Sequence, residues 1–143
     1  MIRQIALVSF LLIGFSGLQA QETIFRKWKT IDDNTGKPRA VVEIYERGGE
    51  LFGKIIKTFP EPGDDPDPIC DKCKGTDKDQ KIIGMEIIRH MKQDGDEWED
   101  GTILDAEEGK TYSCKLWVED GKLKVRGYVA FFFRTQEWLP YEG

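Results

Sequence analysis

Hydrophobic and polar residues alternate along much of this chain, in short runs that end at turn-forming residues. Between positions 112 and 118 every second residue is apolar, and the residues between them are mostly polar. After the hairpin signal Asp120-Gly121, the alternation resumes with Leu123, Val125 and Val129. A period of two places successive side chains on opposite faces of an extended strand. The pattern therefore predicts antiparallel strands with one buried face and one wet face.

Turn signals divide the chain at short, even intervals. Asp94-Gly95, Asp100-Gly101 and Asp120-Gly121 each supply the positive-φ residue that a tight reversal needs. The runs between such signals predict eight strands: Ile24–Ile31, Arg39–Arg47, Glu50–Phe59, Ile82–Met91, Thr102–Asp105, Lys110–Glu119, Lys122–Ala130 and Phe131–Trp138. We expect an all-β fold, a single antiparallel up-and-down β-barrel of about eight strands, which leaves no free edge. A β-sandwich of the same strands is the alternative.

One long connection, from Pro60 to Lys81, interrupts the series of hairpins. Its prolines forbid a regular strand, and a loop of this length in a compact domain is usually functional or disordered. Cys70 and Cys73 lie near its middle, three residues apart. A disulfide between them would staple this part of the loop.

Several motifs, in one order along the chain, resemble the bacterial exported family known as domain of unknown function 2147. They are Ile31-Asp32-Asp33-Asn34-Thr35-Gly36-Lys37-Pro38, Phe52-Gly53-Lys54-Ile55, Cys70-Asp71-Lys72-Cys73-Lys74-Gly75, Gly84-Met85, Gly101-Thr102-Ile103-Leu104-Asp105, Gly109-Lys110-Thr111-Tyr112, Leu123-Lys124-Val125-Arg126-Gly127-Tyr128 and Arg134-Thr135-Gln136-Glu137-Trp138. The resemblance covers essentially the whole chain after the first twenty residues. It carries no activity with it, because the family has none to transfer.

The chain is also similar to the calycins, the lipocalin and fatty-acid-binding barrels, in which a tryptophan on the first strand packs near an arginine on the last. Trp28 and Arg134 occupy those places, although Arg26 stands where lipocalins have a glycine. This resemblance implies a lipocalin-like barrel. It also implies that Trp28 lies inside the base with the Arg134 guanidinium over its face.

The first twenty residues have the pattern of a secretory signal peptide. Arg3 is a positive n-region, residues 5–15 form an apolar h-region too short to span a bilayer, and Ala20 is a small residue before the cut. We expect cleavage between Ala20 and Gln21, which leaves residues 21–143 as a single β-barrel domain. The protein is therefore expected to be exported, to the periplasm or beyond, with no integral membrane segment in the mature chain.

Length and charge restrict the partners. The 123 residues that remain are enough for one domain, which buries roughly two-thirds of the surface of the unfolded chain. Without Arg3, 20 basic side chains face 26 acidic ones, a net charge of −6. Phosphate binding needs a concentrated positive field, so the net charge excludes nucleic acid as an expected partner and disfavours anionic lipid surfaces.

The three cysteines carry the main candidate chemistry. A Cys70–Cys73 disulfide with Cys114 buried as a small hydrophobe is the favoured interpretation, and a bridge from Cys114 to the loop is one alternative. A zinc site of Cys70, Cys73, Cys114 and His90 is a second alternative. Thiol–disulfide exchange is a third, but its active cysteine usually begins a helix, and no helical pattern follows here. No cofactor is indicated.

Two classes of function fit these features. The first is a small exported β-barrel that binds a lipophilic small molecule or a partner, with Trp28, Tyr112, Arg134 and Trp138 as candidate contacts. The second is a structural or interaction scaffold of the cell envelope, whose barrel is filled with side chains. An envelope enzyme is a third hypothesis, for which no serine stands in a nucleophile-elbow context. The apolar run Phe131–Phe133 predicts either a strand covered on both sides or an exposed hydrophobic edge.

Overall fold

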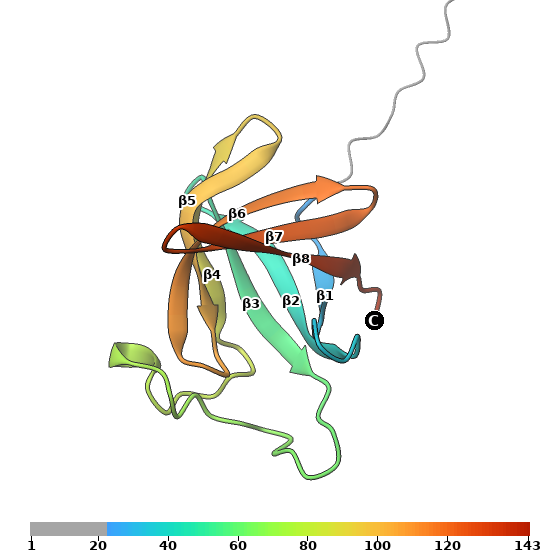
Figure 1. Ribbon diagram of the computed structural model, residues 1–143, viewed down its shortest axis with the longest axis vertical. Helices are drawn as coiled ribbons and strands as arrows, with labels where there is room; N and C mark the ends of the chain where they lie inside the picture. Colours follow the sequence, from blue (N-terminus) through green and yellow to red (C-terminus); the bar gives the residue numbers. More distant parts are fainter. Residues whose placement is uncertain (1–22) are drawn as a thin grey trace, which may run out of the picture.

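Eight antiparallel strands close into one up-and-down barrel in the computed structural model, which describes residues 23–143 (Figure 1). The strands are β1 (Lys27–Ile31), β2 (Pro38–Arg47), β3 (Glu50–Thr58), β4 (Glu86–Asp94), β5 (Glu97–Asp105), β6 (Lys110–Glu119), β7 (Lys122–Val129) and β8 (Phe132–Pro140). Each strand pairs with the next, and β8 returns to pair with β1. The predicted barrel is confirmed, and the sandwich alternative is wrong because one sheet closes on itself. The predicted signal peptide, residues 1–20, lies outside the described residues.

The antiparallel order gives the barrel two distinct ends. The connections after β1, β3, β5 and β7 lie at one end, which we call the loop end. The connections after β2, β4 and β6 lie at the other, together with Thr23 and the C-terminal Gly143, and we call this the terminal end. In Figure 1 the long green connection between β3 and β4 extends from the loop end at the bottom of the view.

Strand β5 differs from the sequence prediction. It begins at Glu97, whereas the sequence predicted a start at 102, because Asp100-Gly101 forms a β-bulge inside the strand rather than a turn. Asp100 has φ 60° there. A Cβ at Gly101 would lie 2.8 Å from the Met91 backbone nitrogen, so only glycine fits against the neighbouring strand β4. Strand β4 also begins later than predicted, at Glu86, and its own bulge places His90 at φ 57°.

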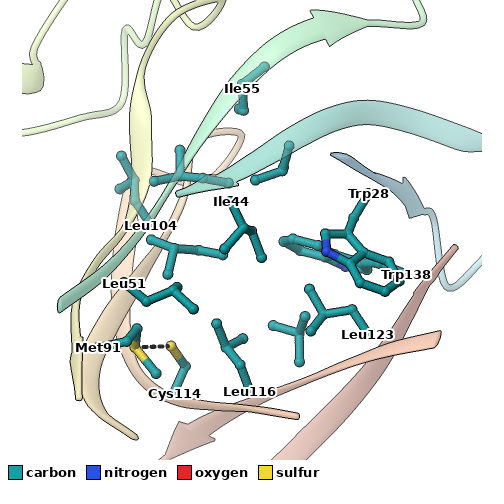
Figure 2. Close-up of a cluster of buried hydrophobic side chains, with 14 of the residues drawn as sticks. Trp28, Ile44, Leu51, Ile55, Met91, Leu104, Cys114, Leu116, Leu123 and Trp138 are labelled. Atoms are coloured by element: carbon teal, nitrogen blue, oxygen red, sulfur yellow. Dashed lines mark hydrogen bonds between the residues drawn. The ribbon is translucent and has the colours of Figure 1, made fainter. Parts of the chain in front are cut away.

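Buried side chains from all eight strands form one hydrophobic core inside the barrel (Figure 2). Trp28, Trp98 and Trp138 occupy the terminal end and are at most 6% exposed. Leucine, isoleucine and valine side chains with Met91 continue the core toward the loop end. Among residues 23–143 no polar or charged residue is buried. The inward-facing positions of an eight-stranded barrel are just sufficient to fill it, as they do here.

The connection between β3 and β4, residues 59–85, covers the loop end beside the β5–β6 turn, and we call it the disulfide loop. It contains one turn of 3₁₀-helix, η1 (Gly75–Asp77), and the Cys70–Cys73 disulfide, which confirms the predicted staple. Both cysteines are buried and belong to the hydrophobic core. The loop lies against the β5–β6 turn so closely that a Cβ on Gly109 would be 2.9 Å from the Cys73 nitrogen. The disulfide therefore serves as part of the cover of the barrel.

Candidate functional site

Two of the candidate ligand contacts, Trp28 and Trp138, are buried in the core at the terminal end of the barrel. Trp28 is 1% exposed and Trp138 is 2% exposed, and Figure 2 shows both indoles inside the barrel. The Trp28 Nε1 donates a hydrogen bond to the carbonyl of Ile24 at 3.0 Å. The Trp138 Nε1 donates to the Gln136 Oε1 at 3.1 Å. With their only polar atoms satisfied and their rings packed, these two side chains offer no free surface to a ligand.

The expected contact between Trp28 and Arg134 is wrong. The guanidinium over the Trp28 ring belongs to Arg26, 5.4 Å from the ring centroid. Trp28 pairs with Pro140 of β8, six residues beyond Arg134, which is roughly 20 Å along an extended strand. Arg134 instead forms an ion pair with Asp33 of the β1–β2 turn.

This ion pair lies in a gap in the barrel wall. Strand β1 pairs with β8 at only two positions, the second being Lys29 with Leu139, so the edge of β8 before Leu139 has no β1 partner in the described part of the chain. The Asp33 Oδ2 spans this gap and accepts hydrogen bonds from the Arg134 guanidinium and, at 2.9 Å, from the Gln136 Nε2. Side chains therefore close the wall where the backbone pairing stops.

We call the connected group Asp33, Arg134, Gln136 and Trp138 the β8 seam. It brings together two of the predicted candidates, Arg134 and Trp138, with two residues that the sequence interpretation missed. Residues 134, 136 and 138 are two positions apart along β8 and therefore share one face, which could have identified Gln136 as a neighbour of Arg134 and Trp138. No pattern in the neighbouring sequence could have identified Asp33 as a member of this group, because its motif indicates only a turn of the chain. The remaining candidate, Tyr112, is half-buried on β6 and takes no part in the hydrogen bonds of the seam.

The inner wall next to the seam is open at the loop end. Gly127 pairs with the inward-facing Cys114, and a Cβ added to it would meet nothing within 4 Å. Val129, which alternation predicted to be buried, is 39% exposed. The core therefore ends at Val125 on this strand, and the β7–β8 hairpin continues beyond it into solvent.

The end of this hairpin is strongly apolar, and we call residues 128–133 the aromatic tip. Phe131 is fully exposed, Phe132 is 67% exposed and Phe133 is 56% exposed. The Arg126 guanidinium lies over the Phe133 ring at 4.3 Å and over the Trp117 ring at 4.9 Å. Of the two predictions for the Phe131–Phe133 run, the structure supports the exposed hydrophobic edge.

Two surface hollows lie on the described part of the barrel. One, of about 510 Å³, lies at the terminal end and is lined by Thr23, Arg26, Lys27, Tyr141, Glu142 and Gly143. The other, of about 460 Å³, lies beside the β5 bulge and is lined by Glu99, Asp100, Gly101, Thr102, Ser113, Cys114, Lys115 and Tyr128. Most of these side chains are polar, unlike the lining of a typical lipophile pocket.

The cysteines and the histidine do not assemble a metal centre. Cys70 and Cys73 are joined to each other, and the Cys114 thiol is buried, donating to the Met91 Sδ at 3.4 Å (Figure 2). Burial raises the pKa of Cys114 to about 12, which keeps the thiol protonated and unreactive at neutral pH. His90 faces solvent, and its Nδ1 lies 3.1 Å from a Glu50 carboxylate oxygen. In residues 23–143 no three metal-ligating side chains lie together, so the zinc alternative lacks its geometry.

A polar cluster on the outer wall is paired within itself. The Tyr45 hydroxyl and both terminal nitrogens of Arg47 donate to the Glu86 carboxylate, with the Arg47 bonds at 3.1 and 3.4 Å. Burial acts to raise the pKa of Glu86, but the hydrogen bonds from Arg47 and Tyr45 outweigh it and hold the pKa below its usual value. Arg47 also lies 3.9 Å above the Phe52 ring. This arrangement links strands β2, β3 and β4.

Comparison with known proteins agrees with this fold. The structure is similar to that described as "Protein HP1028 from the human pathogen Helicobacter pylori belongs to the lipocalin family", with a TM-score of 0.71, 13% sequence identity and 84% of each chain covered. That likeness confirms a lipocalin-like barrel. A search of curated proteins found no match. Within residues 23–143 the structure has no helix that is long and apolar enough to span a membrane.

The sequence comparison identifies the family. The model of the family described as "Uncharacterized protein conserved in bacteria (DUF2147)" matches residues 27–139, which extend from the first strand to the last. The match thus includes the disulfide loop, the β8 seam and the aromatic tip. The protein belongs to this bacterial family.

Proposed function

We propose that the protein is an exported β-barrel binding module that holds a lipophilic partner on its rim, at the aromatic tip, rather than in an internal cavity. The observation that carries the proposal is the exposure of Phe131, Phe132 and Phe133 on a barrel whose interior is filled. The partner could be a small molecule or the apolar surface of an envelope component. The domain that does this is residues 21–143.

The free energy of hydration favours covering these rings. Burying one phenylalanine side chain contributes about 1.5–3 kcal/mol, so three exposed rings at one hairpin represent a substantial unused driving force. Contiguous exposed apolar patches on soluble proteins usually mark contact sites. These rings are not part of the barrel core, which is formed by buried side chains of the eight strands and of the disulfide loop.

Export is supported by two independent features. The first twenty residues have the pattern of a signal peptide. The Cys70–Cys73 disulfide belongs to an oxidising compartment, since cytosolic thiols are kept reduced. Both features support a periplasmic or secreted location.

A titration with lipophilic probes tests the proposal. The probes are N-phenyl-1-naphthylamine, a fatty acid and an isoprenoid alcohol, and the protein is compared with Phe131→Ser. The control is Ile69→Ser, which removes an exposed apolar side chain of the disulfide loop, 48% exposed and outside the tip. We expect saturable binding tighter than about 10 μM, equivalent to roughly 7 kcal/mol. Phe131→Ser should weaken it at least about tenfold, and Ile69→Ser should not.

The filled interior also fits the second candidate, an envelope scaffold that contacts only proteins. The same titration separates the two. A flat response to every lipophilic probe would overturn the binding module and leave the scaffold. Binding that is equal in the protein and in Phe131→Ser would show that the aromatic tip is not the site.

A further inference from the structure

We propose that the aromatic tip docks the barrel onto an anionic lipid bilayer, with the Phe131–Phe133 rings in the acyl boundary and Arg126 at the level of the lipid phosphates. This inference rests on the proposed function, because it identifies the lipophilic partner of the same surface. It adds that the lipophilic partner is a lipid bilayer rather than a dissolved small molecule.

The shape of the tip favours a bilayer. Successive residues of a strand point to opposite faces, so Phe132 and Phe133 project to opposite sides of the hairpin while Phe131 occupies its turn. The apolar surface therefore surrounds the tip. A protein groove or a single small molecule covers one side of such a protrusion, whereas lipid chains surround an inserted tip on every side.

The charges near the tip also favour an anionic surface. Between Lys124 and Glu137 the only charged residues are Arg126 and Arg134. Over residues 122–138 four basic residues face one acidic residue, a net charge of +3, whereas the chain after residue 20 carries −6. The remainder therefore carries −9, and the β7–β8 hairpin is a basic element of an acidic protein. Salt screens charges beyond about 8 Å at physiological ionic strength, so the charges beside the tip, Arg126 and Arg134, govern contact more than the net charge does. Lys122 and Lys124 lie at the far end of the hairpin, where both are paired with Glu137.

The position of Arg126 suits a phosphate. Arg134 is already neutralised by Asp33, but Arg126 has no carboxylate within salt-bridge distance in the described residues. Its Nε donates to the Thr135 Oγ1 at 3.0 Å, and the Trp117 and Phe133 rings hold the guanidinium in place. Arg126 precedes the last residue of β7, Val129, by three positions, which is roughly 10 Å along the strand. Interfacial segments enter the headgroup region by about 5–10 Å, so Arg126 would stand among the phosphates.

The experiment is co-sedimentation of the processed protein with two kinds of vesicle. One kind contains phosphatidylglycerol and phosphatidylethanolamine, and the other contains phosphatidylcholine alone. We expect partitioning into the anionic vesicles that weakens as salt is raised. Phe131→Ser should lower the partition coefficient at least about tenfold, and Arg126→Gln should reduce the preference for anionic vesicles. Ile69→Ser, the matched control, should partition like the unmodified protein.

A second variant reports where the tip lies. Phe131→Trp keeps an aromatic ring, so it should still bind, and its added fluorescence should shift to the blue and be quenched by lipids brominated on their acyl chains. Spectra that change no more than those of the unmodified protein would place residue 131 outside the bilayer and overturn the inference.

Other outcomes separate this inference from the proposed function. If N-phenyl-1-naphthylamine binds through Phe131 but neither kind of vesicle does, the bilayer assignment is wrong and the binding module stands. If neither probe nor vesicle binds, both are wrong. A dimer that is lost in Phe131→Ser would show that a second copy covers the tip, and equal, salt-insensitive binding to phosphatidylcholine would remove the anionic preference.

Discussion

Replacing Gly109 with alanine tests whether the disulfide loop is a packed cover of the barrel. Gly109 lies in the β5–β6 turn with φ +68°. A Cβ there would lie under 3.0 Å from the Lys72 carbonyl and 2.9 Å from the Cys73 nitrogen, both of them backbone atoms of the loop. Backbone cannot rotate aside as a side chain can, so the loop must move away from the turn. We expect Gly109→Ala to displace the disulfide loop from the loop end of the barrel.

A matched glycine separates this effect from simple backbone strain. Gly95 lies in the β4–β5 turn with φ +61°, and a Cβ there would meet nothing within 4 Å. Left-handed backbone costs a residue with a side chain about 1–2 kcal/mol. Alanine recovers part of this by restricting the unfolded chain, by about 0.4–1 kcal/mol. We therefore expect Gly95→Ala to lose about 1 kcal/mol of unfolding free energy. Gly109→Ala should lose about 2–4 kcal/mol, because overpacking adds about 1–3 kcal/mol.

Urea unfolding gives the two losses, provided that the slope of the transition is unchanged. Hydrogen exchange locates them, since the Cys70 amide donates to the Gln80 carbonyl at 2.8 Å and is a reporter inside the loop. Its protection should fall in Gly109→Ala and not in Gly95→Ala. Equal losses in the two variants, with the Cys70 amide equally protected, would refute the packed cover.

Four further predictions concern the core, the free thiol, the pH dependence of stability and the N-terminus. Trp28→Ala should lower the unfolding free energy by about 3–5 kcal/mol in urea, because the ring is almost fully buried, and a loss below about 1 kcal/mol would contradict its packing role. Under non-reducing conditions a thiol reagent should find no reactive group in the folded protein and one, Cys114, after unfolding, whereas three thiols with bound zinc would contradict the disulfide. The pKa of Cys114 rises from its ordinary 9.0 to about 12 on folding, so above pH 9 the unfolded chain releases a proton that the folded one keeps. The unfolding free energy should then fall by up to about 1.4 kcal/mol for each pH unit above 9. Cys114→Ala should remove this part of the pH dependence. N-terminal sequencing of the exported protein should begin at Gln21, and a membrane-bound chain that retains Met1 would contradict cleavage.

The sequence determined the strands, most of the turns and the staple, because each depends on neighbouring residues. Alternation defined which positions share a face, and pairs such as Asp120-Gly121 supplied the backbone conformation of a hairpin. Closely spaced cysteines can bridge without help from the rest of the fold, as Cys70 and Cys73 do. A closed barrel pairs the backbone hydrogen-bonding groups of both edge strands, so the barrel could be predicted from eight such strands.

Asp100-Gly101 is a position where the neighbouring residues alone did not determine the backbone structure. The same pair supplies a positive φ to a turn or to a bulge, and the difference lies in whether the strand continues to pair afterwards. That depends on β6, a partner distant from the pair itself. The late start predicted for β5 follows from this ambiguity.

Only the tertiary structure decided the contents of the candidate site. Alternation assigns a residue to a face but cannot say where the covering layer ends, so Val129 was predicted to be buried and Phe131 was left undetermined, although both lie beyond the core. The partner of Arg134 depended on how far β1 pairs with β8, which is a property of barrel closure rather than of either strand. Burial and pairing across a closed sheet join residues about a hundred positions apart, and no local pattern records them.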